Sequence, residues 1–472
     1  MSEQQYLPTR NPRTGAIDYQ MPVDDAAAVA AAAAALRASQ PAWVEAGVAG
    51  RAAALEAFAH ALQLRREPML AALAADTGRW TEGLIELDAT LGAMQRWCKL
   101  APELMAQGPN TPTSVPHISF IQGRIPFVLT GVISPWNFPL LLSLIDALPA
   151  LLAGCTVLIK PSEVTPRFVP VLRDALAEVP LLRDALALVT GPGSTGAALI
   201  DNVDQICFTG SVSTGRKVGE HAARRFIPAQ LELGGKDAAI VFADADVDRA
   251  AQSLCWASMV NAGQSCMSLE RCYVERSVYE RFAEALRQRV AALRLNWPDI
   301  RVGEIGPVIS APQAEIIRTH LADAYTRGAR ALTGGHVVER DGGFWCEPTV
   351  LVDATSEMQV VRDETFAPVL PLLVFDTEEE AIALANGSDY GLSAAVFSGD
   401  EARALRVAQR LLAGGISIND ASLTALLHEG GKQSFGSSGL GGTRMGVKSI
   451  ERFYRLQAYL INDGTSSPWW YR

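Results

Sequence analysis

The sequence has few of the residues from which disulfide frameworks and metal centres are built. Its seven cysteines are an odd and scattered set, which we interpret as reduced thiols. The six histidines include no pair four residues apart, and no second pair of ligands accompanies Cys266 and Cys272. We therefore expect no bound metal.

Long apolar runs and clusters of basic residues are also missing. The most apolar stretches, 140–152 and 26–36, are too short or too rich in alanine for a membrane span, which needs about 20 apolar residues. A net charge of -10 without a polybasic run argues against nucleic-acid or anionic-membrane partners. Residues 1–18 show no apolar run after basic residues, so we expect no secretory signal and a cytoplasmic location.

Apolar residues are abundant instead. Hydrophobic residues make up 49% and charged residues 19% of the chain, a balance typical of a compact α/β enzyme. The 472 residues allow about three domains or subdomains. Alanine-rich runs and leucines at helical spacing predict helices across residues 24–107, a region without visible chemistry.

Short β-branched runs then alternate with helical patterns. They lie at 127–133, 156–159, 185–190 and 205–208, and each is followed by a turn and a helical pattern. This alternation predicts a mostly parallel sheet with helices on both faces, in which ligands bind beyond the carboxyl ends of the strands. A second α/β region is predicted over residues 237–425, with strands at 238–242, 272–275, 369–375 and 394–397 and helices starting at Asp248, Val278, Gln313 and Thr377.

Two further segments suit edge strands. Prolines bracket the alternating residues 117–121 within 108–126, a pattern typical of an edge strand or hairpin. Together with the strand-like run 458–462, this hairpin either forms a sheet shared between subunits or packs on its own domain. The aromatic tail 468–472 either docks on a protein surface or is an inert end.

Two glycine turns are candidates for binding a phosphate. Residues 191–196 fit the dinucleotide pattern G-x-G-x-x-G, but their strand comes late in the series and Pro192 removes an amide donor. The turn 208–215 is the better candidate, because Ser211 and Ser213 offer hydroxyl and backbone donors at a helix N-terminus. The alternative for this turn is a simple connection between a strand and a helix.

Several charged residues lie at expected strand ends. Lys160 and Glu163 could hydrogen-bond a ribose, or form a surface ion pair. Glu232 is a candidate general base, and its alternative is an ion pair with Lys236. Segment 363–368 could grip a ribose and stack on a nicotinamide, or form a packed turn.

Cys266 is the candidate nucleophile. It lies between a helical run that ends near Val260 and a strand near Arg271, and the small residues Gly263 and Ser265 leave room around its sulfur. Taken alone, a packing role is the commoner one for cysteine.

In combination, these motifs resemble the aldehyde dehydrogenase superfamily over nearly the whole length of the chain. The resemblance depends on six motifs in family order: Pro135-Trp136-Asn137-Phe138-Pro139, residues 160–163, residues 208–215, Glu232-Leu233-Gly234-Gly235-Lys236, residues 261–266 and residues 364–368. It implies a Rossmann-like dinucleotide-binding domain (1–107 and 127–234), a second α/β catalytic domain (235–432) and a small β oligomerisation element (108–126 and 450–472).

The resemblance also implies a chemistry. The Cys266 thiolate attacks an aldehyde, and the Asn137 side chain with the Cys266 backbone amide stabilises the oxyanion. After hydride transfer, Glu232 activates the water that hydrolyses the thioester. Relatives that acylate coenzyme A typically lack this glutamate, so water is the expected acceptor. The alternatives are a coenzyme A-acylating enzyme and a non-catalytic nucleotide-binding protein of the same fold.

The expected cofactor is NAD or NADP, with NAD preferred because Glu163 would repel a 2′-phosphate. The expected cofactor-binding residues are Ile133, Pro135, Trp136, Lys160, Ser162, Glu163, Gly193, Phe208, Thr209, Gly210, Ser211, Leu233, Gly234, Glu364 and Phe366. The expected substrate-pocket residues are Phe138, Leu141, Leu142, Ile145, Ser265, Met267 and Phe435.

Two departures and one open question remain. Many hydrolytic members carry a lysine where this chain has Asp146, so the proton-relay role of that lysine does not transfer. The glycine-rich segment 430–441 also differs from the family pattern. The apolar pocket residues favour an uncharged small aldehyde, with Arg271 and Arg444 as the alternatives that would bind a carboxylate. We expect a homodimer or homotetramer.

Overall fold

The computed structural model describes residues 4–106, 108–465 and 468–471. The predicted helical region is confirmed and consists of α1 (Ala26–Glu45), α2 (Gly47–Leu64), α3 (Arg66–Thr77) and α4 (Thr81–Leu104). Asp25 caps α1 by accepting a hydrogen bond from the Ala28 amide. A hairpin that the sequence did not reveal, β1 (Tyr6–Arg10) with β2 (Ile17–Pro22), precedes these helices.

The first large sheet has six strands in the order β21-β9-β8-β5-β6-β7. Its strands are β5 (Leu129–Ile133), β6 (Thr156–Lys160), β7 (Leu186–Leu188), β8 (Gln205–Thr209), β9 (Ala229–Glu232) and β21 (Gly439–Leu440). All neighbours are parallel except β21, which runs antiparallel to β9. The chain runs outward from β5 to β7 and then returns to place β8 on the other side of β5. This reversal makes the carboxyl ends of β5 and β8 a topological switch point, where open α/β sheets bind ligands.

Helices connect and cover this sheet, as the alternating pattern predicted. They are α5 (Pro139–Leu144), α6 (Ala147–Ala153), α7 (Phe168–Ala177), α8 (Pro180–Arg183), α9 (Gly193–Asn202) and α10 (Val212–Arg225). Ser211 caps α10 by accepting from the Thr214 amide, so the N-terminus of α10 lies at the end of β8.

The second large sheet has seven strands in the order β12-β15-β16-β11-β10-β18-β19. Its strands are β10 (Asp237–Val241), β11 (Leu269–Glu275), β12 (Arg330–Thr333), β15 (Thr349–Val352), β16 (Val369–Phe375), β18 (Ser393–Phe397) and β19 (Gly415–Ile418). All four predicted strands of this region are confirmed, whereas the sequence did not reveal β12, β15 and β19. The helices of this region are α11 (Val247–Met259), α12 (Tyr279–Ala291), α13 (Ala311–Thr326), α14 (Gln359–Arg362), α15 (Glu378–Asn386), α16 (Glu401–Ala408) and α17 (Leu423–Leu426). β13 (Val337–Arg340) and β14 (Gly343–Cys346) form a small hairpin, and β17 (Tyr390–Gly391) pairs antiparallel with the distant β20 (Phe435–Gly436).

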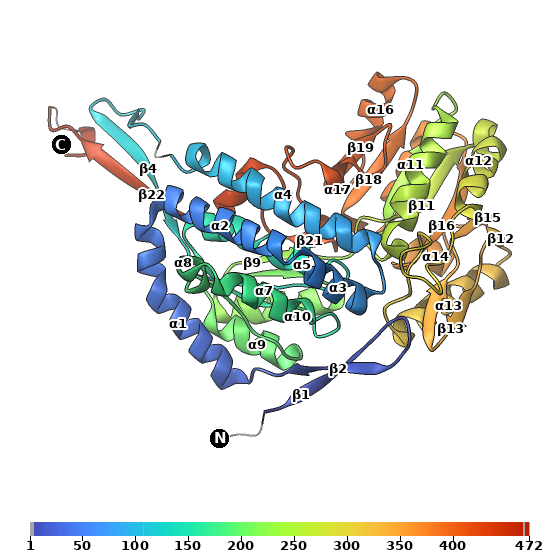
Figure 1. Cartoon of the computed structure of the whole chain (residues 1–472). Helices are drawn as coiled ribbons and strands as arrows, with labels where there is room; N and C mark the ends of the chain where they lie inside the picture. Colours follow the sequence, from blue (N-terminus) through green and yellow to red (C-terminus); the bar gives the residue numbers. More distant parts are fainter. Residues whose placement is uncertain (1–3, 107, 466–467, 472) are drawn as a thin grey trace.

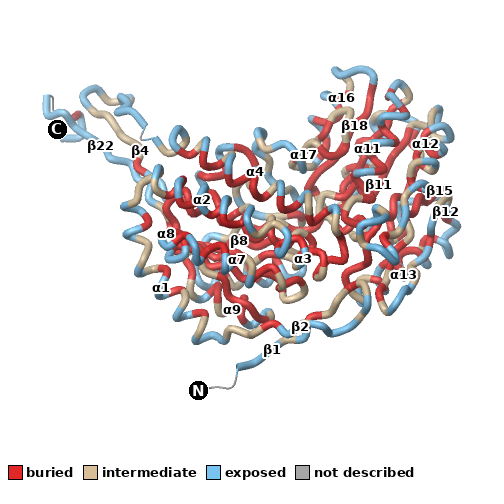
Figure 2. The backbone as a smooth tube through the Cα atoms, viewed as in Figure 1, coloured by how far each residue is buried: buried red, intermediate tan, exposed pale blue. Residues whose placement is uncertain are grey.

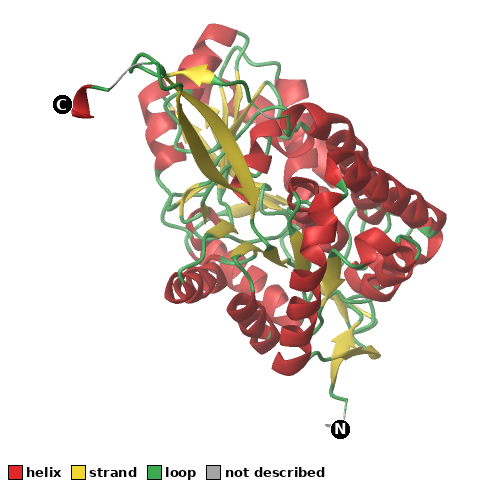
Figure 3. Cartoon of the chain, turned by 90° about the vertical axis from the view of Figure 1, so that its left-hand side faces the viewer, coloured by secondary structure: helices red, strands yellow, loops and turns green. Residues whose placement is uncertain are grey.

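A third sheet projects from the body. β22 (Tyr454–Asn462) pairs antiparallel with β4 (Ile118–Pro126) over nine residues, and β3 (Thr111–Pro112) completes the order β22-β4-β3. Figure 1 shows β4 and β22 extending away from the helices, and in Figure 3 the same two long strands lie side by side in front of the body. The two distant segments for which the sequence left a shared sheet and a separately packed hairpin open therefore pair with each other within one chain. The rings of Trp469, Trp470 and Tyr471 contact one another edge to face and remain exposed.

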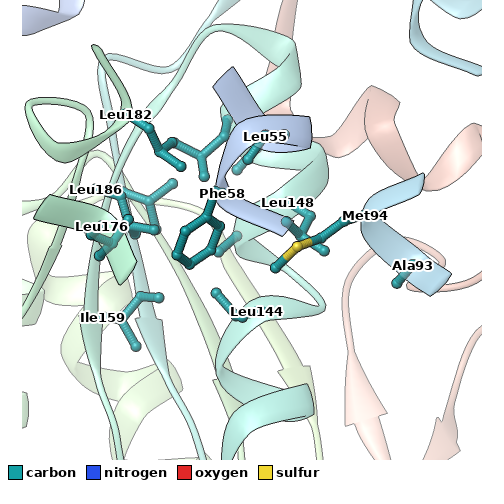
Figure 4. Close-up of a cluster of buried hydrophobic side chains, with 14 of the residues drawn as sticks. Leu55, Phe58, Ala93, Met94, Leu144, Leu148, Ile159, Leu176, Leu182 and Leu186 are labelled. Carbon is teal, nitrogen blue, oxygen red and sulfur yellow. The ribbon is translucent and has the colours of Figure 1, made fainter. Parts of the chain in front are cut away.

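The buried side chains form separate cores in the two α/β parts (Figure 2). In the first part, Phe58 lies among Leu55, Leu148 and Leu176, and Met94 of α4 reaches the same cluster (Figure 4). One face of α4 is therefore fixed in the core. Among the described residues, no helix has the length and apolar character needed to cross a bilayer.

Candidate active site

A cavity of about 440 Å³ lies between α4, α5, the end of β9 and the segment around α17. Both Cys266 and Glu232 line it. So do six of the seven residues expected in the substrate pocket: Phe138, Leu141, Leu142, Ile145, Ser265 and Met267. The seventh, Phe435, belongs to β20, and its exposed side chain is not among the lining residues. Its neighbours Gln433 and Ser434 do line the cavity.

The loop before Cys266 has an unusual backbone. Asn261, Ala262 and Gly263 have φ values of 58°, 52° and 67°. Asparagine and glycine tolerate this left-handed conformation, but an alanine held there stores about 1–3 kcal/mol of strain. A Cβ on Gly263 would lie 2.1 Å from the Ala367 carbonyl, so only glycine fits between the loop and the segment before β16.

Side chains from distant elements fix this loop. Arg79 donates to the Asn261 carbonyl at 2.9 Å, and Glu82 of α4 accepts from the Asn261 amide at 3.2 Å. The Gln264 side chain donates to the Pro307 carbonyl at 3.0 Å and accepts from the Ile309 amide at 3.0 Å. Cys266 therefore follows a backbone that is fixed from two sides. Sequence reasoning missed Arg79 and Glu82, which lie in a helical region that carries no motif.

Asn137 contacts the same loop rather than the cavity. The side-chain Nδ2 of Asn137 donates to the Gln264 backbone carbonyl at 3.1 Å. The backbone carbonyl of Asn137 accepts from Asn261 Nδ2 at 3.1 Å. Asn137 is buried and is not among the lining residues. The buried Glu86 fixes the start of α5 by accepting from the amides of Leu140 and Leu141. Asn137 and the Cys266 loop are thus joined directly by hydrogen bonds.

Glu232 ends β9, and Ser434 donates to its Oε2 at 2.8 Å. The alternative of an ion pair with Lys236 is wrong, because Lys236 Nζ binds Glu270 at 2.5 Å in the interior. Glu270 also accepts from the amides of Thr365 and Phe366, at 2.7 and 2.8 Å. Lys236 therefore holds the 364–368 turn in place and leaves the Glu232 carboxylate free of a lysine partner.

The Gly-Gly pair after Glu232 brings its segment against Cys266. A Cβ on Gly235 would lie 2.5 Å from the Cys266 carbonyl oxygen, and a Cβ on Gly234 would lie 2.6 Å from the Glu364 carboxylate. The Gly235 amide donates to Glu364 Oε1 at 3.0 Å. Three expected site segments, those of Glu232, Cys266 and Glu364, therefore lie in contact.

Burial dominates the electrostatics of Cys266. It raises the pKa of the thiol to about 12, a rise that Asp237 increases and that Arg444 and Lys432 oppose. Lys432 lines the cavity and donates to the Thr424 carbonyl at 3.0 Å. The resting thiol is therefore protonated at neutral pH, and a further positive charge would be needed to stabilise its thiolate.

Asp146 replaces the lysine expected from the resemblance, and it binds two arginines. Arg444 donates to it at 3.2 and 2.5 Å, Arg452 forms a second ion pair with it, and all three side chains are almost fully buried. Arg444 also donates to Thr209 at the end of β8. Burial raises the pKa of Asp146, but the two guanidinium groups outweigh it and lower the pKa to about 2.

Neither of the two arginines considered from sequence has a free guanidinium. Arg444 lines the cavity but is bound by Asp146. Arg271 is buried and donates to the carbonyls of Lys236 and Ala385. Both are therefore occupied by partners within the chain.

Most of the expected cofactor residues lie at the carboxyl edge of the first sheet. Ile133, Lys160 and Thr209 end β5, β6 and β8, and Ser211 caps α10 next to the switch point. The neighbouring residues Pro135, Ser162, Phe208, Gly210 and Leu233 belong to the same strand ends and turns. Gly193 differs, because it begins α9 after β7, at the far edge of the sheet from the switch point.

Two pairs of expected cofactor residues contact each other. Lys160 Nζ binds Glu163 Oε2 at 2.6 Å, with the lysine buried and the carboxylate partly exposed. The rings of Trp136 and Phe366 lie edge to face with their centroids 5.5 Å apart. The structure thus joins the motif around Asn137 to the 364–368 turn. In the described ranges, no group of three or more His, Cys, Asp or Glu side chains is arranged to hold a metal ion.

Known proteins share this sequence and architecture. The model of the aldehyde dehydrogenase family matches residues 1–459. A Mycolicibacterium smegmatis protein provisionally named succinate-semialdehyde dehydrogenase (NADP+) is 36% identical over 89% of this chain and 82% of its own length.

Two solved structures show the same likeness. A provisionally named aldehyde dehydrogenase from Anabaena variabilis is 50% identical, with a TM-score of 0.96 over 99% of this chain and 100% of its own. Betaine aldehyde dehydrogenase from Staphylococcus aureus in complex with NAD+ is 29% identical, with a TM-score of 0.90 over 98% of this chain and 93% of its own. The chain belongs to the aldehyde dehydrogenase family, and its reaction is the NAD(P)-dependent oxidation of an aldehyde.

Proposed function

We propose that Cys266 is the nucleophile and Glu232 the general base of this oxidation, with Asn137 as an oxyanion donor. The observation that carries the proposal is that Cys266 and Glu232 line one cavity, and that Gly235 packs against the Cys266 carbonyl. Asn137 supports it because its amide reaches the same loop, two residues before the cysteine.

The three residues would act in successive steps of the reaction. The Cys266 thiol gives its proton to solvent, and the thiolate attacks the aldehyde carbon while the developing alkoxide accepts hydrogen bonds from the second N–H of Asn137 and the Cys266 backbone amide. After the hydride has left, a thioester remains on Cys266. Glu232 then takes a proton from a water molecule, which hydrolyses the thioester to a carboxylic acid. Ser434 orients the Glu232 carboxylate through its hydrogen bond to Oε2.

The residues at the switch point suit a dinucleotide. The α10 N-terminus and its Ser211 cap offer donors to a phosphate, Lys160 and Glu163 offer polar groups to a ribose, and Trp136 with Phe366 offers an aromatic wall. The bound nicotinamide supplies the hydride acceptor, and its positive charge favours the Cys266 thiolate. NAD is the proposed preference over NADP, because the Glu163 carboxylate is partly exposed and would repel a 2′-phosphate.

We assign a separate function to the part of the chain around each of the three main sheets. We assign dinucleotide binding to the six-stranded part (1–107 and 127–234), catalysis to the seven-stranded part (235–432) and oligomerisation to the β3-β4-β22 sheet (108–126 and 450–472). Eight of the nine residues of β22 are exposed, including Leu456 and Leu460, which supports a homodimer or homotetramer that covers this strand. Light scattering on the wild type and on Leu460→Lys tests the assembly, and a monomeric wild type would contradict it.

An aldehyde panel with NAD and NADP tests the function. We expect reduced nicotinamide to form with the wild type and not with Cys266→Ala, with unchanged circular dichroism. Glu232→Gln is expected to release a first-turnover burst of reduced cofactor but to deacylate slowly. Product analysis with and without coenzyme A tests water as the acceptor. Turnover that persists in Cys266→Ala would contradict the nucleophile assignment.

A further inference from the structure

One face of α4 lines the cavity for most of the length of the helix. Ile85, Ala89, Gly92 and Arg96 follow one another at spacings of four and three residues, which places them on one stripe. Glu82, at the start of this stripe, binds the Asn261 amide next to the Cys266 loop. Arg96 lies about four turns further along the helix, toward the open end.

Arg96 has a half-buried guanidinium without a fixed partner. Within residues 4–106, 108–465 and 468–471, it makes no hydrogen bond and no ion pair. Burial lowers its pKa, and Glu429 is the acid whose charge acts on it most. Glu429 is itself exposed and accepts a hydrogen bond from the His428 backbone. Burying a guanidinium that loses hydration without gaining a hydrogen-bond acceptor costs free energy. The Arg96 guanidinium is therefore suited to bind an incoming anion.

Two other donors line the cavity near Arg96. Burial and the charge of Arg96 lower the pKa of His428, which leaves a neutral imidazole with one N–H to donate. Lys432 lies closer to Cys266 and donates to the Thr424 carbonyl and to the Met267 sulfur, so one of its three N–H groups remains. In contrast, the pocket cation Arg444 is neutralised by Asp146.

Apolar side chains line the same cavity as the sulfur and Arg96, among them Ile85, Leu141, Leu142 and Trp97. The cavity therefore combines a reactive sulfur, apolar walls and a cationic group. Such a site fits a substrate molecule with an aldehyde at one end, methylene groups in the middle and an anionic group at the other end.

We propose that the substrate is an aliphatic aldehyde with a terminal carboxylate, and that Arg96, with His428, binds this carboxylate. The planar guanidinium of Arg96 can hold a carboxylate with two parallel hydrogen bonds. This inference rests on the proposed function, because it fixes the reacting aldehyde at Cys266. It replaces the uncharged substrate favoured by the sequence, which gave no signal for Arg96 because the residue lies on a helix far from every motif.

The test compares aldehydes of equal chain length with three different ends. Straight-chain aldehydes carrying a carboxylate, a methyl group or an ammonium are assayed with NAD(P) on the wild type, Arg96→Gln, Arg96→Lys and Lys99→Gln. Lys99 is the matched control, because it lies on the same helix but is exposed and outside the cavity.

We expect the wild type to prefer the carboxylate and to use the ammonium aldehyde worst. Arg96→Gln should raise KM for the carboxylate aldehyde about 10- to 100-fold, the worth of a hydrogen-bonded charge, and leave KM for the methyl aldehyde unchanged. For the carboxylate aldehyde, KM of Arg96→Lys should lie between the values of the wild type and Arg96→Gln. KM of Lys99→Gln should match the wild type. Equal use of carboxylate and methyl aldehydes by the wild type, or an equal loss for both in Arg96→Gln, would overturn the proposal.

A binding measurement separates this inference from the proposed function. The unreactive dicarboxylate of the same length is titrated calorimetrically into the wild type and Arg96→Gln. We expect binding to the wild type that Arg96→Gln weakens about 10-fold or more. Binding of this kind without turnover of any aldehyde would contradict the catalytic assignment and leave the anion site standing. Turnover of aldehydes without dicarboxylate binding would contradict the anion site alone.

Discussion

The carboxylate of Asp146 binds the guanidinium of Arg444 across 298 positions of sequence, at the inner wall of the cavity. Arg452 approaches the same carboxylate, so two positive charges surround one buried negative charge. The positive charge that the resemblance places after the Asn137 motif is therefore supplied here by the C-terminal segment. An arginine does not release its proton at physiological pH, so this group can fix charge but cannot relay protons.

Asp146→Asn should destabilise the protein strongly. Removing the carboxylate leaves two buried guanidinium groups without a counter-charge, which costs about 3–5 kcal/mol in comparable sites. Thermal unfolding followed by circular dichroism measures the loss. The control is Asp376→Asn, which breaks the exposed pair with Arg276 and should leave thermal unfolding nearly unchanged. Equal shifts in the two variants would show that the Asp146 cluster does not hold the C-terminal segment.

Asn137→Ala should lower kcat by about 10²–10³, the usual cost of one oxyanion donor. The side chain also holds the Gln264 carbonyl, so part of this loss would reflect a displaced loop. Gln264→Leu separates the two effects, because it removes the hydrogen bonds to Pro307 and Ile309 but keeps the Asn137 amide. Steady-state kinetics should show a smaller loss in kcat for Gln264→Leu. The reverse order would assign Asn137 a positioning role only.

Gly235→Ala should abolish most of the activity while the fold is retained. Its Cβ would lie 2.5 Å from the Cys266 carbonyl oxygen and 2.7 Å from Asp237 Oδ1, so the cysteine loop must shift. Displacements of about 1 Å can cost 10²-fold in rate. Gly108→Ala is the control, since nothing lies within 4 Å of a Cβ there. Wild-type kinetics in Gly235→Ala would contradict the close contact between the two segments.

The periodicity of the sequence predicted most of the fold. Strands β5, β6, β8, β10, β11, β16 and β18 and the helices between them were found, because buried parallel strands read as continuous β-branched runs. Edge-strand patterns marked β4 and β22 as strands and left their pairing as one of two alternatives. Strands β12, β15 and β19 were missed because they are only four residues long and lie among turns.

The candidate site was predictable only where a motif marks it. Cys266, Glu232 and Asn137 belong to motifs, and their loops lie in contact. Arg79 lies in the turn between α3 and α4, and Glu82 and Arg96 lie on α4, in a region that looks like scaffold; their contacts arise only when this region packs beside the cysteine loop. The position of Phe435 could not be deduced, because the pairing of β20 with β17 joins two-residue strands that leave no periodic signal.

The titration of Asp237 should make the free energy of unfolding depend on pH, and this dependence can be measured. Burial raises its pKa to about 7, although hydrogen bonds from Ser393 oppose the rise. Between about pH 4 and 7 the folded protein keeps a proton that the unfolded chain has lost, so the free energy of unfolding falls as pH rises, by up to about 1.4 kcal/mol per unit. The stabilising contribution is complete below pH 4 and absent above pH 7.

Asp237→Asn should remove this part of the pH dependence. Its amide keeps a hydrogen-bond acceptor for the Ser393 amide and a donor for the Ser393 hydroxyl, so the packing at the start of β10 is retained. Melting temperatures of wild type and variant should converge at low pH and separate toward pH 8 in favour of the variant. A constant difference across the range would mean that Asp237 has the same pKa in the folded and unfolded states, which would contradict the effect of burial.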